Sequence, residues 1–478
     1  MMKSKQLTLI LIVTALMLAA CGKQTAAIAP AATQAASGQE ATQAESAPTE
    51  SSQQPSEASQ DCGTDSGEGC APASERVDLT PPTFSNPTSI TNPLFPIKDL
   101  HSVILLGNVD GHLMRTETTL LPKTEVIEWN GQKVETLVSQ YVAYLDGRIE
   151  EIAIDRYAQA DDGSVWYFGE DVSDFKDGVV VSTEGTWLAG KDGPPAMIMP
   201  ANPQVGDVYR SENIPGNVFE EVTVKEINVT VDGPHGPVTG AMVGEELHMD
   251  GSTEDKIFAP GYGEFWTGSG GDLEALALAA PTDTLSELVP AELDTLTNGA
   301  LDIFNAAEAE DWDSASATLE SMNTAWEKYQ ASGNVPPLLA AHMSRALQAL
   351  AGDALIPAVN AHNVGGARRA AVRAALASRD LELQYRTPTE IDRARFDLWV
   401  RQLLVDAAGT EPGPVLGDVR ILELIWDRIG HTYEDADASR IEAALADLRT
   451  AADNEDLEAA SKAAGQLEDI LASVKPKS

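Results

Sequence analysis

The chain has 478 residues, with 74 acidic against 32 basic side chains, so its formal net charge is -42. Negative charge on this scale repels phosphate backbones and excludes nucleic acid as an expected partner. Repulsion from anionic lipid headgroups also makes a spacer useful between a membrane anchor and a folded body. Hydrophobic residues form 43% of the chain, which is ordinary for globular proteins and gives room for two or three domains.

Residues 1–21 show a secretory pattern. Lys3 and Lys5 precede an apolar run over residues 7–18, which is too short to span a bilayer. The run ends in Leu18-Ala19-Ala20-Cys21, which resembles the lipobox of bacterial lipoproteins. The resemblance implies that residues 1–20 are a signal peptide and that Cys21 receives a lipid that holds the mature chain on a membrane. An ordinary signal peptide with a chance cysteine is the alternative. We expect an extracytoplasmic protein anchored to the cell membrane or the outer membrane.

Residues 21–87 are rich in Ala, Ser, Thr, Gln, Glu and Pro and nearly lack large apolar side chains. Such a segment cannot bury enough surface to fold, so it predicts a disordered tether behind the lipidated cysteine. Cys62 and Cys70 are the only other cysteines. Outside the cytoplasm a pair at this spacing predicts a small disulfide loop. A metal site there is disfavoured, because two thiolates without a nearby histidine leave a tetrahedral ion half coordinated.

Residues 88–280 have the pattern of an antiparallel β-meander. Asn-Gly and Asp-Gly pairs supply the positive φ angles of two-residue hairpins. They recur as Asp110-Gly111, Asn130-Gly131, Asp146-Gly147, Asp162-Gly163, Asp177-Gly178, Asp232-Gly233 and Asp250-Gly251. The apolar alternation changes phase at Lys225-Glu226, which predicts a β-bulge. We expect a curved sheet, a sandwich or a barrel-like closure.

Several stretches of this section carry a resemblance. They are Asn92-Pro93-Leu94-Phe95-Pro96, residues 157–170 (YAQADDGSVWYFGE), Gly185-Thr186-Trp187, Met197-Ile198-Met199-Pro200-Ala201, Gly206-Asp207-Val208-Tyr209 and Ala259-Pro260-Gly261-Tyr262-Gly263. They are similar to stretches of a family of uncharacterised bacterial secreted and lipid-anchored proteins. The chain departs from that family after Phe95-Pro96, where Leu100-His101-Ser102-Val103 replaces a strand start of the Gly-Thr-x-Trp kind. The resemblance implies a β fold and brings no known activity.

Aromatic residues form only 5% of the chain, yet several gather in this section. Aromatic side chains on a concave sheet can hold a lipid, a sugar or a peptide. The candidate ligand-binding residues on this ground are Trp166, Trp187, Tyr262 and Trp266. The alternative is that these side chains form the core of the sheet itself.

Residues 285–474 are dominated by Ala, Leu, Glu and Arg, which predicts an all-α bundle of about eight helices in antiparallel hairpins. Asp311, Asn363 and Asp456 precede apolar-periodic stretches and can cap the helices that follow. Thr387-Pro388-Thr389-Glu390 has the pattern of a capping box. The fold class is therefore α+β in two sections. Because the two sections have separate apolar patterns, we expect each to fold alone.

Two stretches of the helical section carry a second resemblance. Residues 383–408 (LQYRTPTEIDRARFDLWVRQLLVDAA) and 417–433 (GDVRILELIWDRIGHTY) resemble parts of uncharacterised bacterial helical-bundle domains. The resemblance implies two consecutive helices that face each other, and it brings no known reaction.

Glu423, Asp427 and His431 are spaced four residues apart on one ridge of a predicted helix and are the candidate metal ligands. Zinc or iron would need further ligands from a facing helix. The alternative is a solvated stripe, with His431 favoured near a helix C-terminus.

The helical section also contains the one basic concentration of this acidic chain. It consists of Arg368, Arg369, Arg373 and Arg379. These side chains can dock an anionic partner, or they can neutralise neighbouring acidic helices.

The chain contains no G-x-S-x-G elbow, H-E-x-x-H motif or P-loop. The sequence therefore favours a non-enzymatic lipoprotein that binds a small molecule, a glycan or a protein. The alternative is a metal-dependent or hydrolytic enzyme whose site lies in the bundle or at the junction of the two sections. No cofactor is expected, and a divalent metal is left open.

Overall fold

The structure is a computed structural model that describes residues 62–333, 335–355 and 363–477. Cys21, the predicted signal peptide and residues 22–61 of the predicted tether lie outside the described residues. The predicted disulfide between Cys62 and Cys70 is present, with an S–S distance of 2.00 Å.

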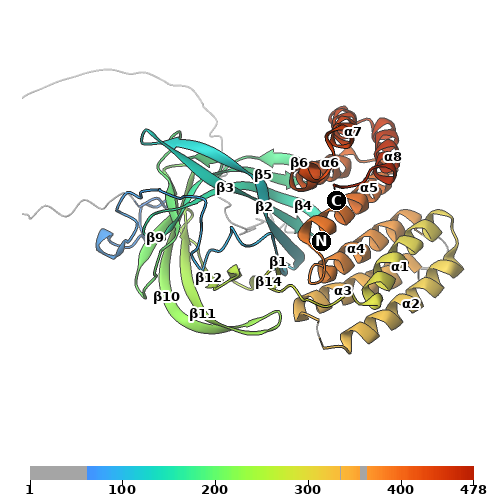
Figure 1. Ribbon diagram of the computed structural model, residues 1–478, viewed down its shortest axis with the longest axis horizontal. Helices are drawn as coiled ribbons and strands as arrows, with labels where there is room; N and C mark the ends of the chain where they lie inside the picture. Colours follow the sequence, from blue (N-terminus) through green and yellow to red (C-terminus); the bar gives the residue numbers. More distant parts are fainter. Residues whose placement is uncertain (1–61, 334, 356–362, 478) are drawn as a thin grey trace, which may run out of the picture.

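The β-section forms one antiparallel sheet of 14 strands (Figure 1). The main path runs β6-β5-β4-β3-β2-β1-β14-β13-β12-β11-β10-β9, and β7 and β8 pair with β5. The strands are β1 (Ser102–Val109), β2 (His112–Trp129), β3 (Gln132–Leu145), β4 (Arg148–Gln159), β5 (Val165–Lys176), β6 (Val179–Ser182), β7 (Trp187–Leu188), β8 (Ala196–Met199), β9 (Val208–Ile214), β10 (Val218–Gly233), β11 (Gly236–His248), β12 (Thr253–Ala259), β13 (Gly263–Ser269) and β14 (Asp272–Ala280). The predicted meander is confirmed as a curved sheet that is not closed, because β6 and β9 at its ends do not pair with each other.

The hairpin turns follow the predicted chemistry at most positions. Asp110, Asn130, Asp146 and Asp177 adopt positive φ angles between 49° and 53°, as the first residue of such a turn requires. The prediction is wrong at Asp232-Gly233, which are the last residues of β10. The turn there falls on residues 234 and 235. The ring of Pro234 fixes a negative φ angle, which suits the first central residue of a type I or type II turn. The strand register shifts between Val224 and Glu226, where the β-bulge was predicted.

The sheet bends until its two halves face each other across a concave side (Figure 1), and strands of both halves contribute side chains to one cavity there. Successive side chains of a strand point to opposite faces. On β3, Tyr141 lines the concave cavity, whereas Val142 packs against the helices on the convex face. Each strand therefore serves two separate environments.

Residues 62–87 differ from the predicted tether, because they lie against the sheet. The amide of Asp65 donates to the carbonyl of Met249 at 2.7 Å, and the amide of Ala71 donates to Glu221 at 2.7 Å. Backbone hydrogen bonds of this kind order a segment that has little apolar surface of its own. The ordered body therefore begins about 26 residues before the predicted boundary at residue 88.

The second section is helical, as predicted. Its elements, with the short helix near the start of the described chain, are η1 (Ala73–Glu75), α1 (Ala291–Glu308), α2 (Trp312–Gln330), α3 (Pro337–Ala349), η2 (Leu350–Leu355), α4 (Val364–Glu382), α5 (Pro388–Ala407), α6 (Pro412–Ile429), η3 (Gly430–Thr432), α7 (Asp435–Asp453) and α8 (Leu457–Ser473). Among the described residues, no helix combines the length and the apolar character needed to cross a membrane.

The predicted caps of these helices are confirmed. Asp311, Asn363 and Asp456 each accept a hydrogen bond from the backbone amide three residues later, at the start of α2, α4 and α8. Thr387 and Glu390 form the reciprocal capping box of α5, with Pro388 at its first position. These contacts satisfy amides that a helix leaves without partners.

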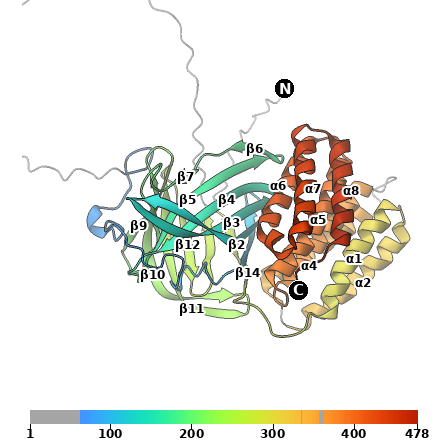
Figure 2. The same cartoon turned by 45° about the horizontal axis from the view of Figure 1, so that its top comes forward.

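The helices lie together on the convex side of the sheet (Figures 1 and 2). One core combines Ile104 and Leu278 of the sheet with side chains of α1–α5. Another combines Val142 and Ile152 of the sheet with side chains of α5–α8, such as Ile425. The apolar face of the bundle is therefore completed by the sheet.

We predict that residues 285–478 do not unfold cooperatively when they are expressed without the sheet. Removal of the sheet exposes the helix side chains that pack on Ile104 and Ile152, and burial of apolar surface stabilises by about 25 cal/mol per Å². Independent folding, which the sequence pattern predicts, would give a sharp transition. Thermal unfolding followed by circular dichroism measures this, with the joined chain as control. A transition of the isolated helices near that of the joined chain would contradict the shared-core account.

Candidate functional site

A cavity of about 470 Å³ lies where the convex face of the sheet meets the helices. Residues of β2, β3 and the start of β4 line one side of it, and residues of α3, α4, α5 and α6 line the other. This volume is in the range of pockets that hold small organic molecules. We call it the junction cavity. Its lining has a buried charged base, apolar walls and an exposed basic rim.

The base joins β2 to α4 and α5 through paired charges. Asp380 on α4 accepts two hydrogen bonds from Arg115 on β2, both at 2.9 Å. Arg395 on α5 donates to Asp380 at 2.6 Å and to Glu117 on β2 at 2.8 Å. Asp380, Glu117 and Arg395 are all buried. Because one carboxylate serves two arginines, the three elements are held in one register.

Arg428 on α6 extends the base. It contacts Glu117, lies 3.4 Å from Asp392 and donates to the side-chain oxygen of Gln140 at 2.6 Å. The resulting buried charge network has six ionic members: Arg115, Glu117, Asp380, Asp392, Arg395 and Arg428. Three arginines face three carboxylates, so each charge has a partner within the network, and burial raises the pKa of Asp392.

The electrostatics of Glu117 reflect its partners. Burial alone would raise the pKa of this carboxyl, but the charges of Arg395, Arg428 and Arg115 outweigh burial and hold the pKa far below its ordinary value. The pKa of Asp380 is also lowered, by Arg115 and Arg395 against the effect of burial. Both groups are therefore ionised at neutral pH.

The walls of the junction cavity are apolar and aromatic. The rings of Tyr144 on β3 and Trp399 on α5 stack with centroids 5.9 Å apart and an interplanar angle of 19°. Met114, Leu376 and Ile425 line the same space. A flat or aliphatic body would gain contact area here without leaving polar groups unpaired.

The rim has cations that form no ion pair within the described part of the chain. Arg345 on α3 and Arg373 on α4 are both exposed, and neither forms an ion pair with any described residue. Partial burial and then the charge of Arg148 lower the pKa of Arg373, as expected for a cation that is incompletely compensated. In total, six arginines and three carboxylates line the cavity. The cavity is thus basic in a strongly acidic protein.

His342 on α3 also lines the junction cavity, where the charges of Asp380 and Arg345 act on it. Burial lowers its pKa to about 4, against the opposing charge of Asp380. The imidazole is therefore neutral at neutral pH and offers one hydrogen-bond donor and one acceptor to the cavity.

The structure places the candidate aromatic residues elsewhere, in two separate cores. Trp166 and Trp187 are 5% and 1% exposed, and they belong to the core that fills one end of the concave side. The indole of Trp187 donates to Glu212 at 2.7 Å. Tyr262 and Trp266 pack on a different core, and the Tyr262 hydroxyl donates to Asp283 at 2.8 Å. Of the four candidates, only Tyr262 also lines the cavity on the concave side of the sheet. These four side chains therefore do not form one surface.

The candidate metal ligands also lie apart from the cavity. Glu423 forms a two-point ion pair with Arg449, at 2.9 and 2.6 Å, while Asp427 and His431 are exposed. In the described part of the chain, a different group has possible metal-ligand atoms close together. It consists of Glu220, Glu246 and His248, on β10 and β11. It belongs to the concave side of the sheet, away from the helices.

The four arginines of the predicted basic concentration have different roles: three contact other side chains of the helices, and one faces the junction cavity. Arg369 pairs with Asp406 at 3.1 Å, Arg379 pairs with Glu382 at 2.6 Å, and Arg368 lies over the ring of Phe304. These three side chains serve the helices. Arg373 alone reaches the junction cavity.

The base of the cavity was not predicted from the sequence. The hydrogen bond from Arg395 to Glu117 joins residues 278 positions apart. Spacing along a helix shows that Asp392 and Arg395 share a face, but no local pattern indicates which strand they meet. The alternation Arg115-x-Glu117 on β2 was the available signal, since two charges on one face of a strand need partners when that face is buried.

We predict that Glu117→Gln lowers the free energy of unfolding by about 3–5 kcal/mol, because it leaves buried arginines without a counter-charge. Urea denaturation measures the change. Glu128→Gln, at an exposed position of the same strand, is the control and should change stability by less than about 0.5 kcal/mol.

The same substitution should alter the pH dependence of stability. A carboxyl whose folded pKa is lowered stabilises the fold above its unfolded pKa of about 4.3, and this contribution is lost as the pH falls further. The Glu117→Gln variant should lose less stability than the wild type between about pH 5 and pH 3. Equal stability of the two proteins at neutral pH would show that the network does not hold the sections together.

The chain was compared with known protein families and with curated protein sequences, and neither comparison finds a match.

Proposed function

We propose that this protein is a lipoprotein of the cell envelope that binds a small organic anion in the junction cavity and catalyses no reaction. The expected ligand has an aromatic or aliphatic body and one acidic group. The observation that carries the proposal is the pair of rim cations without ion pairs among the described residues, Arg345 and Arg373, beside apolar walls.

The rim and the walls of the junction cavity suit different parts of one ligand. Arg side chains bind carboxylates and sulfonates through charge-assisted hydrogen bonds. The stacked pair of Tyr144 and Trp399 offers apolar contact to the rest of the molecule. A ligand oriented with its acidic group at the rim and its body on the walls would use both.

The internal pairing of the base supports this orientation. Because the members of the buried charge network are already paired, an anion gains little by entering deeply. Deep entry would also place it near Glu117 and Asp380, which are ionised. The acidic group is therefore expected at Arg345 and Arg373.

The net charge of -42 does not prevent such binding. At physiological ionic strength the Debye length is about 8 Å, so charges on distant surfaces are largely screened. The arginines that line the cavity act at shorter range. Long-range repulsion would slow the association of an anion, and added salt would reduce that effect.

The enzyme alternative receives less support from the lining. The described lining residues include no serine, threonine or cysteine that could act as a nucleophile beside His342. His342 is neutral and lies near arginines, which suits hydrogen bonding to a ligand.

Attachment to a membrane is the second part of the proposal. Residues 22–61 are Ala-, Ser-, Thr- and Gln-rich, and a flexible chain of this length spans roughly 35 Å. Such a spacer behind a lipidated Cys21 would hold the acidic body away from anionic headgroups.

The binding proposal is tested with 1-anilinonaphthalene-8-sulfonate, an aromatic sulfonate whose fluorescence rises in apolar surroundings. The lipid-free body, residues 22–478, is titrated with it. The double variant Arg345→Gln, Arg373→Gln should bind at least about tenfold more weakly, because each lost charge-assisted hydrogen bond contributes about 1.5–3 kcal/mol.

Two controls separate charge from apolar contact. N-phenyl-1-naphthylamine has the same aromatic body without the sulfonate, and its binding should be unchanged in the double variant. Arg440→Gln, at an exposed position on α7, should bind the sulfonate as the wild type does. Equal affinity of the sulfonate for the wild type and the double variant would contradict the proposed site.

The anchor is tested separately in the producing cell. Cys21→Ser should abolish lipid attachment and leave the protein unprocessed or released, because serine lacks the thiolate that takes the lipid. Mass spectrometry of the mature N-terminus reads the result. A lipid-free mature form of the wild type that is cut at another site would end the lipoprotein proposal.

A further inference from the structure

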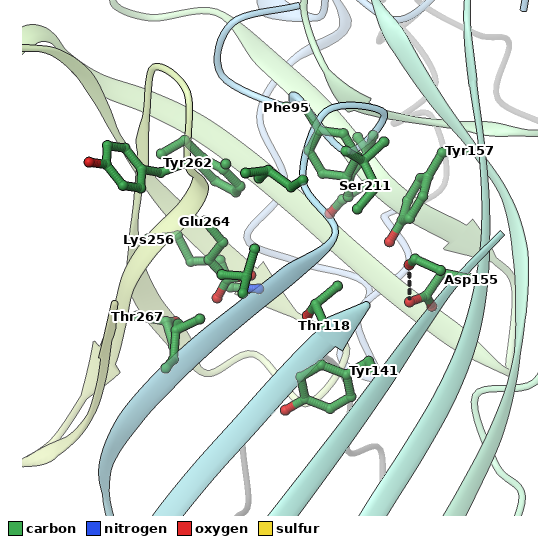
Figure 3. A pocket seen from close by; sticks show the side chains of 18 of the residues that line it. Phe95, Thr118, Tyr141, Asp155, Tyr157, Ser211, Lys256, Tyr262, Glu264 and Thr267 are labelled. Carbon is green, nitrogen blue, oxygen red and sulfur yellow. Dashed lines mark hydrogen bonds between the residues drawn. The ribbon is translucent and has the colours of Figure 1, made fainter. Parts of the chain in front are cut away.

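The concave side of the sheet contains a second cavity, of about 100 Å³. Strands from both halves of the sheet surround it, and the proposed anion site lies on the opposite face. Figure 3 shows Tyr141, Tyr157, Lys256, Glu264 and Thr267 around this space. The lining combines aromatic rings with carboxylates, in contrast to the arginines of the junction cavity.

The cations already present on this side are engaged. Lys256 contacts Glu246 and lies 3.5 Å from Glu254. His248 lies 3.6 Å from Glu220 and 3.7 Å from Glu254. These pairs account for three of the buried carboxylates.

Glu264 and Glu274 have no ion-pair partner among the described residues, although the charge of Lys256 acts to lower the pKa of both. Both line the cavity. Glu274 is only 4% exposed. A buried carboxylate without a partner is unfavourable, so the site either keeps a proton or takes up a cation.

Hydroxyl groups in the same lining point to a ligand independently of the carboxylates. Thr267 is 6% exposed, and its Oγ1 has no hydrogen-bond partner. Tyr209 is 0% exposed, and its hydroxyl also lacks a partner. Buried polar groups are nearly always hydrogen-bonded, so an unpartnered hydroxyl facing a cavity needs an occupant.

We propose that this cavity binds a small primary ammonium ion, whose N–H groups donate to Glu264, Glu274 and Thr267. A primary ammonium carries three donors, which match two carboxylates and one hydroxyl oxygen. The aromatic rings of Tyr141 and Tyr157 would lie beside its charge and its short apolar body. A quaternary ammonium has no N–H and would leave Thr267 unpartnered.

A metal ion is a weaker explanation of the same features. Among the described residues, the possible metal ligands that lie close together are Glu220, Glu246 and His248. Lys256 already contacts Glu246 of this group. The fixed ammonium of Lys256, which lines the same cavity, repels a divalent cation about twice as strongly as a monovalent one. Glu264 and Glu274 are not part of this group.

Binding of the ammonium should release protons. Burial first, and then the charge of Glu264, raise the pKa of Glu274 to about 8, while Thr116 and Lys256 act in the opposite direction and Glu254 adds to the rise. In the free site Glu274 is therefore largely protonated at pH 7. A bound cation favours the ionised carboxylate, so affinity should increase as the pH rises toward about 8.

Isothermal titration calorimetry with n-butylammonium chloride tests the proposal on the lipid-free body. Titrations near pH 7 in phosphate and in HEPES, which differ in ionisation enthalpy, report the proton release. Neutral n-butanol and tetramethylammonium are matched probes, and both should bind at least about tenfold more weakly because each lacks the charge or the N–H donors.

Variants locate the site. Glu274→Gln and Glu264→Gln should each weaken n-butylammonium binding by at least about tenfold, and Glu274→Gln should abolish most of the proton release. The double variant Arg345→Gln, Arg373→Gln should bind the amine normally, so failure of the anion site and failure of this site are distinguishable. A variant without a thermal unfolding transition is not folded and is left out. The proposal is then tested on the wild type alone, by its relative affinities for the three probes and by its proton release.

Three results would overturn the proposal. They are no heat of binding with n-butylammonium, equal binding of n-butanol, and displacement of the amine by calcium or zinc at lower concentration. The last would make the site a metal site instead.

Discussion

The buried charge network between β2 and helices α4, α5 and α6 is the interaction on which the arrangement of the two sections depends. Burial of so many charges is unfavourable unless every member has a partner. Asp380 receives Arg115 from the sheet and Arg395 from α5, so a shift of either element would break a pair. The network therefore fixes the register of the helices on the sheet, and the apolar cores shared by both sections stabilise the same register.

Alternation along β2 then separates two chemical environments. Arg115 and Glu117 point to the helices and form the base of the junction cavity, whereas Thr116 and Thr118 line the cavity on the concave side. The convex side concentrates arginines and the concave side concentrates carboxylates. A single strand thus supports two sites that select ligands of opposite charge, because a sheet only one residue thick has two faces.

Local features of the fold could be predicted from the sequence, because their causes are local. The turn at Asn130-Gly131, the cap at Asp311 and the box at Thr387 each depend on residues within four positions. Long-range features could not. Nothing near Arg395 indicates that it meets Glu117, and nothing near Trp187 shows that it is core. The order of residues 62–87 was missed because backbone hydrogen bonds to the sheet leave no compositional signal. Cys21 lies outside the described residues, so the lipid anchor stays a prediction.

A crystal structure of the lipid-free body with a bound aromatic sulfonate tests the central claim most directly, because it locates the ligand. The account predicts the sulfonate group within hydrogen-bond distance of Arg345 and Arg373, about 2.7–3.2 Å, and the aromatic body against Tyr144 and Trp399. A ligand bound on the concave side, or an acidic group paired with the buried charge network instead of the rim, would contradict it.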